Sequence, residues 1–448
     1  MSALLTLRPV SGSALPTGSG HSKSDVARFI NNKARTLLGR AQRLAKLTPD
    51  TLGYRPPDLP YIPSSGHLRA ANRRLSAIER TVQQRLAELK RVLAAPGDPQ
   101  NALLTLAMVE REIDRARRTF GMLFEVFAQR GTGFAPSLAA HDVIASDCYA
   151  VVRSNAPGLI APPLLEPVTY MEHGYSPATM RRGVSLSRLL GESNPFPLIR
   201  IPWDREHPWE AVYLHEIAHN LQADMRLWVE NRKVVIERLA TARLSPLTIS
   251  IFGRWHKEIF ADLAACLLGG PAVALDLATF LAHPADKVMT YRPGGPHPTG
   301  YLRVLILAEM IHRMGFPAEA ARLTQVWRKL YDPRRGHRIP AIILREAGRA
   351  IPAVVDEICF QPRRGLAERA LASLIPFTRE DEARIRRAGM LLARGRVPTA
   401  MPPRFLVSAC SYAIDAGADV ARLSKLMIDH LSRRSPATRA TAPTTIAA

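Results

Sequence analysis

The pentapeptide His215-Glu216-Ile217-Ala218-His219 determines how the rest of the chain is interpreted. On a helix, residues four apart lie on the same face, one turn from each other. The imidazoles of His215 and His219 can therefore reach one zinc ion at about 2.0–2.1 Å. Glu216 follows the first of these ligands, so it can hold a water molecule and act as a general base without binding the metal. The pattern predicts a metal site on a helix.

The residues on both sides of the pentapeptide also favour a helix. Pro208 suits a first helical turn. Apolar residues recur at helical rather than alternating spacing, at Val212, Leu214, Ile217, Ala218 and Leu221. No helix-breaking residue follows until Ser245-Pro246, so we expect this helix to run past Leu239 toward Arg243.

The third ligand decides the class of site, because a catalytic zinc needs three protein ligands and one open position. A metzincin would have Gly at 222 and His at 225. This sequence has Gln222 and Met225, which excludes that class.

Glu258 is the expected third ligand. Glu258 and Asp262 are again four residues apart on a predicted helix, and Glu258 follows His219 by 258 − 219 = 39 residues. We expect Asp262 to accept the free N–H of a ligand histidine, most plainly His215, which would fix its tautomer.

Two alternatives to this ligand set remain at the level of sequence. Glu258 could be a surface carboxylate paired with Lys257 or Arg254. His256 could replace it as a ligand, although a residue two positions away points to a different side of the helix.

With these motifs the chain resembles the gluzincin metallopeptidases, the thermolysin-like group that binds zinc through two His and one Glu. The resemblance covers roughly residues 208–315. It implies a zincin-like core, a Zn²⁺ cofactor, hydrolysis of a protein or peptide substrate and Glu216 as the catalytic base.

The resemblance also implies a downstream His or Tyr that stabilises the oxyanion formed during hydrolysis. A Pro/Gly-rich loop over 292–303 offers His297 and Tyr301 for that role, with Arg303 as a helper. The alternative is that His297 caps the helix expected over 302–314 and that Tyr301 belongs to the core.

The remaining pattern predicts a mostly α protein of α+β type, with a small sheet before the metal helix and helical regions on both sides. Two long helices are expected near 67–94 and 100–130, as an antiparallel pair. Short strands are expected at 168–171 and 197–201. The resemblance to gluzincins implies that residues 195–202 form an edge strand that aligns substrate beside the site.

These patterns suggest five regions. Residues 1–23 and 433–448 are rich in small and polar residues and are expected to be disordered. Between them we expect a helical N-terminal region over 24–133, the metallopeptidase core over 134–330 and a helical C-terminal region over 331–432.

The composition limits the class of protein. The 448 residues carry a formal net charge of +22, and 47% are hydrophobic. Four widely spaced cysteines and the absence of a leader pattern or a long apolar stretch predict a cytoplasmic protein with reduced thiols.

The charge leaves two interpretations open. Many of the arginines occur in pairs such as Arg73-Arg74 and Arg386-Arg387, spread along the whole chain. They would either attract nucleic acid or an anionic surface, or reflect a biased composition on solvated faces. The first reading allows a metalloprotease associated with nucleic acid. A separate alternative is a basic helical adaptor with a structural or catalytically silent zinc site.

Overall fold

The computed structural model describes residues 20–44, 46–94, 98–160, 164–174, 176–182, 193–204, 207 and 209–434. The expectation of disorder over 1–23 and 433–448 therefore falls largely outside the described residues. It is wrong for residues 20–23, because the first helix begins at Gly20. Pro208 also lies outside them, and the metal helix begins at Ala211.

The chain is mostly helical, with one small three-stranded sheet among the described residues, as the sequence predicts. The α-helices are α1 (Gly20–Ala41), α2 (Ser65–Ala94), α3 (Pro99–Ala128), α4 (Ala135–Asn155), α5 (Ala211–Asp224), α6 (Trp228–Thr241), α7 (Pro246–Gly269), α8 (Pro271–Leu281), α9 (Ala285–Val288), α10 (Gly300–Arg313), α11 (Pro317–Leu330), α12 (Ala341–Cys359), α13 (Leu371–Leu374), α14 (Arg379–Ala393), α15 (Pro403–Asp415) and α16 (Val420–Ser432). Short 3-10 helices span Pro56–Tyr61, Gln129–Gly131, Pro333–Arg335 and Arg364–Leu366.

The chain divides into two compact units, one made of residues up to Lys46 together with Asn72–Met122, and one made of the rest. The boundaries fall inside α2 and α3, whereas the sequence suggested one N-terminal region over 24–133. In the first unit, Ile30 and Leu37 of α1 pack with apolar residues of α2 and α3. α2 and α3 match the two long helices expected from the sequence.

The sheet of the second unit has β3 (Leu198–Ile201) at its centre. β3 pairs in parallel with β1 (Val168–Met171) and antiparallel with β2 (Ala178–Met180), so the order is β1-β3-β2. The predictions of strands at 168–171 and 197–201 are confirmed. The prediction of an edge strand over 195–202 is wrong, because β3 lies between β1 and β2, and β2 is the outer strand of the sheet within the described residues.

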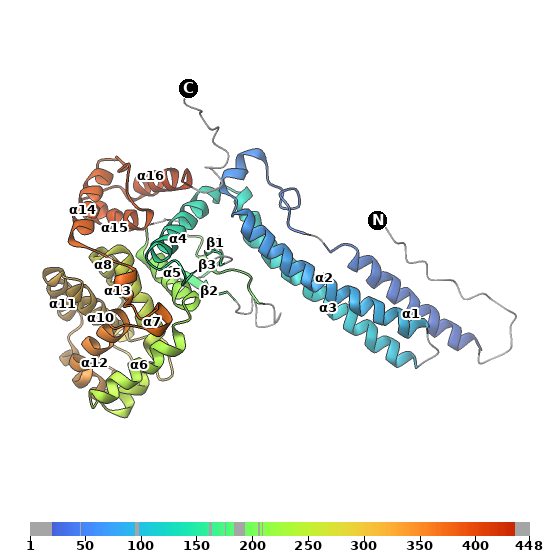
Figure 1. The fold of residues 1–448 in the computed structure, drawn as a ribbon, viewed down its shortest axis with the longest axis horizontal. Helices are drawn as coiled ribbons and strands as arrows, with labels where there is room; N and C mark the ends of the chain where they lie inside the picture. Colours follow the sequence, from blue (N-terminus) through green and yellow to red (C-terminus); the bar gives the residue numbers. More distant parts are fainter. Residues whose placement is uncertain are drawn as a thin grey trace, which may run out of the picture. The chain divides into compact units, whose positions relative to one another are not determined.

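The metal helix α5 lies between this sheet and the helices that follow it, as Figure 1 shows in green and yellow-green. It contacts β2 on one side and packs along α7 on another. α7 begins where Pro246 breaks the chain, and the Ser245 hydroxyl accepts a hydrogen bond from the backbone N–H of Thr248. It ends at Gly270, which has a φ of +81°. Its start agrees with the break at Ser245-Pro246 that the sequence predicted.

The prediction that α5 continues to Arg243 is wrong. The chain turns at Arg226, which has a φ of 58°, and α6 begins at Trp228. The backbone N–H of Arg226 bonds to the carbonyl of Ala223, and that of Leu227 to the carbonyl of Gln222. This is a Schellman turn, in which the left-handed position is usually glycine. An arginine in that position gives no signal of the turn in the sequence.

A buried hydrogen-bond network joins α4, β1 and α5. The Tyr213 hydroxyl lies 2.6 Å from the Thr169 hydroxyl and donates to the His141 carbonyl at 3.1 Å. The His141 ring packs edge-on against the Tyr213 ring, with 4.7 Å between centroids. Tyr213 precedes the first metal-site histidine by two residues, so this network anchors the start of the metal helix.

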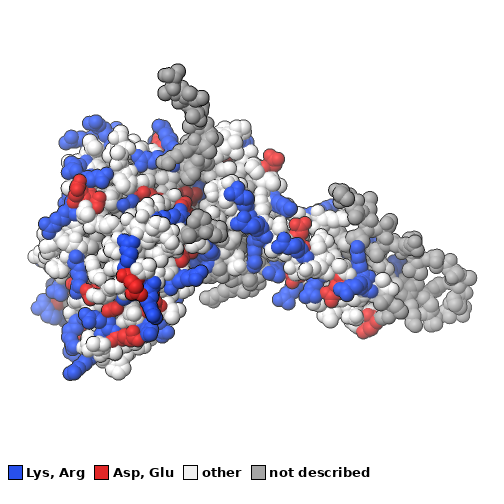
Figure 2. Space-filling view, viewed as in Figure 1, with Lys and Arg blue, Asp and Glu red and all other residues white. Residues whose placement is uncertain are grey.

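Lys and Arg side chains are spread over the face shown in Figure 2, with acidic side chains between them. Many arginines of the described part of the chain are in ion pairs, for example Arg386 with Glu319 at 3.0 Å and Arg404 with Asp147 at 2.9 Å. Within the described part of the chain, no helix is long and apolar enough to span a membrane.

Candidate metal centre

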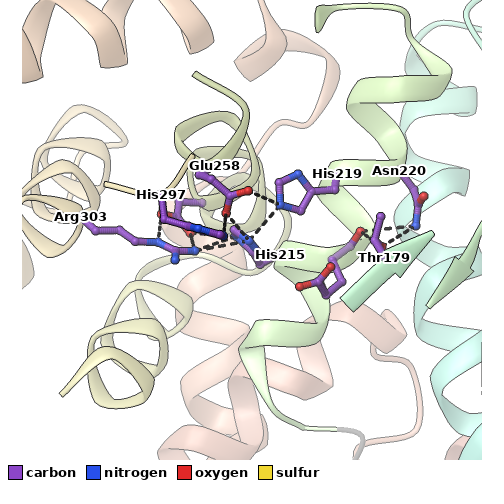
Figure 3. A network of polar contacts seen from close by, with 9 residues as sticks. Thr179, His215, His219, Asn220, Glu258, His297 and Arg303 are labelled. Atoms are coloured by element: carbon purple, nitrogen blue, oxygen red, sulfur yellow. Dashed lines mark hydrogen bonds and ion pairs between the residues drawn. The ribbon is translucent and has the colours of Figure 1, made fainter. Parts of the chain in front are cut away.

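Three side chains from two helices bring their ligand atoms to one point. His215 and His219 extend from α5, and Glu258 extends from the neighbouring α7 (Figure 3). The two Nε2 atoms are 3.1 Å apart. The Glu258 carboxylate oxygens lie 3.5 Å from Nε2 of His215 and 3.4 Å from Nε2 of His219. Among the described residues these three form the group suited to a metal ion.

These distances fit a shared zinc ion. Two atoms that each lie about 2.1 Å from one ion, at the tetrahedral angle, are about 3.4 Å apart. All three separations are close to that value, although the two histidines face different oxygens of the Glu258 carboxylate. Two imidazole nitrogens and one carboxylate oxygen are also the donor set that a hydrolytic zinc uses. The residues present therefore fit the metal that the sequence predicts.

Asp262 and Arg303 lie on the side of His215 that faces away from the candidate metal position. The Nδ1–H of His215 donates to the Asp262 carboxylate at 2.8 Å, which leaves Nε2 to face Glu258. Arg303, on α10, holds the same carboxylate with two hydrogen bonds, from Nε at 2.5 Å and from Nη2 at 2.7 Å. The structure thus places Asp262 where the sequence predicted it and gives Arg303 a contact that the sequence did not indicate.

The charges of the cluster depend on each other. Burial opposes a charged imidazole, but the Asp262 carboxylate outweighs this and raises the pKa of His215 to about 9. Burial would likewise raise the pKa of Glu258, but hydrogen bonds from His215 and His219 hold it well below its usual range. A metal ion would take the place of the His215 proton as the positive charge between these carboxylates.

Glu216 is next to the cluster without being part of it. It is buried, and burial raises the pKa of its carboxyl to about 7, against the attraction of His215. Its backbone carbonyl accepts a hydrogen bond from the Thr179 hydroxyl of β2 at 3.0 Å, and Asn220 donates to that hydroxyl (Figure 3). β2 is thereby tied to the metal helix at the position of the expected base.

His297 reaches the cluster from the loop before α10. Its Nε2 lies 3.3 Å from the Glu258 carboxylate, and its side chain is 61% exposed. The alternative that it caps the next helix is wrong, because the Thr299 hydroxyl accepts from the backbone N–H of Leu302 in that role. Burial lowers the pKa of His297. The proposed role of this side chain in stabilising an oxyanion stays a prediction.

Tyr301 and His256 are not brought to the site. Tyr301 is buried and lines a separate cavity of about 1340 Å³ between α10, α11 and α12. Because Arg303 faces the metal cluster, Tyr301, two residues earlier on the same helix, points to another side. His256 is buried with its Nδ1 2.8 Å from the Gly253 carbonyl. We therefore correct the assignment of Tyr301 to the site.

The cluster opens into a cavity of about 590 Å³. Glu216 and Glu258 line it together with residues that the sequence analysis did not select: Ser176, Pro177, Ala178, Thr179, Arg181, Val212, Lys257, Phe280, Leu281, His283 and Lys287. The segment Ser176–Arg181 comes from β2 and its flanks. The sequence gives no sign that this segment lines the cavity, because a three-residue strand has little periodicity.

No family model matches the chain, no curated protein matches its sequence and no solved structure matches its fold. Function is therefore inferred from the geometry of this site.

Proposed function

We propose that the protein is a zinc-dependent peptidase of zincin type, with His215, His219 and Glu258 as the metal ligands. The observation that carries this proposal is the convergence of two imidazole nitrogens and the Glu258 carboxylate, 3.1–3.5 Å apart, beside the buried carboxyl group of Glu216. The cluster has three ligand residues among the described ones. An open fourth position is typical of a catalytic zinc, whereas a structural zinc is usually closed by four protein ligands.

In this proposal each side chain has one task. A bound zinc ion would supply Lewis acidity toward a carbonyl group and lower the pKa of a water molecule. Glu216 takes the proton from that water and returns it to the leaving amine. Asp262 holds His215 in the tautomer that leaves Nε2 for the metal, and His297 is the candidate donor to the developing oxyanion.

The edge strand β2 would position the substrate. Its Ala178 and Thr179 line the cavity, and among the described residues β3 is the one strand that pairs with it. An extended peptide could add to the free edge of such a strand through backbone hydrogen bonds. We therefore propose that β2, in place of residues 195–202, aligns the substrate beside the site.

The substitution Glu216→Gln tests the catalytic part of this proposal. It removes the base but none of the metal ligands, so zinc content should stay unchanged while hydrolysis falls by roughly 10²–10⁴-fold. The measurement is the appearance of new peptide termini by mass spectrometry, from a mixture of unstructured peptides incubated with zinc-loaded protein.

The matched control is Glu237→Gln, which makes the same change at an exposed position on α6. This variant should cleave like the wild type. Full activity of Glu216→Gln would contradict the assignment of the base, and the absence of cleavage by the zinc-loaded wild type would contradict the peptidase proposal.

A further inference from the structure

Two basic side chains each contact the same aromatic ring at the edge of the cavity that contains the candidate metal cluster. The guanidinium carbon of Arg181 lies 3.4 Å from the centre of the Trp228 ring, and Nζ of Lys257 lies 4.0 Å from the same ring. Arg181 follows β2, Trp228 begins α6 and Lys257 lies on α7. Arg181 and Lys257 both line the cavity that contains the metal cluster.

The other charges of the cavity do not neutralise this pair. The carboxylate of Glu258 is directed at the two metal-site histidines. Arg303 is held by Asp262 behind the cluster. Within the described residues, no ion pair joins Arg181 or Lys257 to an acidic side chain, and the two cations repel each other. The Glu258 carboxylate attracts both cations at longer range, but it is shared with His215 and His219. A carboxylate of a ligand would therefore add a second counter-charge beside this pair.

We propose that Arg181 and Lys257 bind a carboxylate group of the peptide substrate, supplied by an acidic side chain or by a free C-terminus. This inference rests on the proposed peptidase function and names the substrate class for the same site. A planar guanidinium binds a carboxylate through two parallel hydrogen bonds, and an ammonium adds a second point charge. The Trp228 ring holds both cations in place through cation–π contacts.

The rest of the cavity suits the uncharged part of such a peptide. Val212, Phe280 and Leu281 add apolar surface to its wall, and Ala178 and Thr179 add the edge of β2. A few charged groups on a largely apolar wall fix the orientation of a ligand. One peptide could therefore lie on the strand edge, place a bond at the metal and set its carboxylate on Arg181 and Lys257.

Binding to the zinc-loaded Glu216→Gln protein tests this inference apart from catalysis. The probes are NBD-labelled hexapeptides of alternating Ala and Leu, in which one Glu is moved through the six positions. Each has a matched Gln peptide, and all of these are C-terminal amides. A further Ala-Leu peptide with a free C-terminal carboxylate forms the second arm, and affinity is read by fluorescence anisotropy.

We expect one position of Glu, or the free C-terminus, to raise affinity about tenfold to a hundredfold over the neutral peptide. The arm that shows the gain identifies the source of the carboxylate. The double variant Arg181→Gln/Lys257→Gln, made in the Glu216→Gln protein, should lose this preference while neutral peptides bind as before. Lys233→Gln, which removes a charge from a side chain that is 72% exposed on α6, should keep it.

Equal binding of acidic and neutral peptides, or no binding up to about 1 mM, would overturn the inference. So would an acidic preference that survives in the double variant when circular dichroism shows that the variant is folded. If the wild type cleaves Glu and Gln peptides equally well, the carboxylate inference fails and the peptidase function stands. If nothing is cleaved but the acidic preference depends on Arg181 and Lys257, the peptidase function fails instead.

Discussion

Asp262 is a buried carboxylate that links the metal cluster to the rest of the protein. It accepts from His215 on one side and from Arg303 on the other, and these two contacts hold its pKa below the usual range against the effect of burial. A buried charge of this kind needs both partners, since an unpaired charge in the interior is costly. The orientation of His215 therefore depends on a residue that does not touch the metal.

The substitution Asp262→Asn should weaken zinc binding by about 10–100-fold, because the amide is a poorer acceptor for the His215 N–H and leaves Arg303 unpaired. Competition with a chromogenic zinc chelator measures this affinity. Asp286→Asn, an exposed change on α9, is the control and should bind zinc like the wild type. Unchanged affinity in Asp262→Asn would show that Asp262 does not orient the ligand.

The sequence alone predicts site residues that lie within one helical turn of each other. His215 and His219 form one pair four residues apart, and Glu258 and Asp262 form another, so helix geometry alone places each pair on one face. Arg181, Trp228 and Lys257 come from three elements, and only the folded chain brings them together. Tyr301 was assigned by resemblance, and the helical phase of α10 directs it elsewhere.

At the scale of elements, the contact of α4 with α5 includes a titratable group. His141, on α4, is buried against Tyr213, and burial lowers the pKa of its imidazole to about 4. The unfolded chain takes up a proton near the ordinary value of 6.5. Between pH 6.5 and pH 4 the unfolded chain binds this proton and the folded chain does not. The free energy of unfolding therefore decreases as the pH falls through this range.

We expect His141 to account for about 2 kcal/mol of the fall in unfolding free energy between pH 7 and pH 5. Urea unfolding of wild type and His141→Gln, both with a chelator present to remove any effect of metal release, measures the difference. The exposed His312→Gln variant should fall by as much as the wild type. An equal loss in His141→Gln would contradict the buried neutral state of this histidine.

Elements with strong periodicity or clear end signals were predicted correctly, and the others were not. α7 starts at the break that Ser245-Pro246 predicted. The turn after α5 was missed because Arg226 takes the left-handed position without a glycine. β2 was missed because three residues carry too little pattern, and its place beside β3 made the expected edge strand a central one.

At the scale of the molecule, the candidate metal cluster lies within a large apolar core. Leu214, Ile217, Phe260 and Leu263 from the two ligand helices are fully buried in it. Packing on this scale contributes far more than one ion pair to folding. The mostly helical class with a small sheet before the metal helix was predictable from composition and periodicity. The division into two units was not, because its boundaries fall inside α2 and α3.

Zinc content per chain, measured by elemental analysis on wild type and Glu258→Ala side by side, tests whether His215, His219 and Glu258 form a zinc site. We expect about one zinc in the wild type and clear loss in the variant. Glu237→Ala, an exposed change on α6, should keep the metal, and circular dichroism should show equal helical content in all three proteins. A wild type without zinc, under conditions that load a known zinc protein, or a Glu258→Ala variant that keeps it, would contradict the two-histidine, one-glutamate centre.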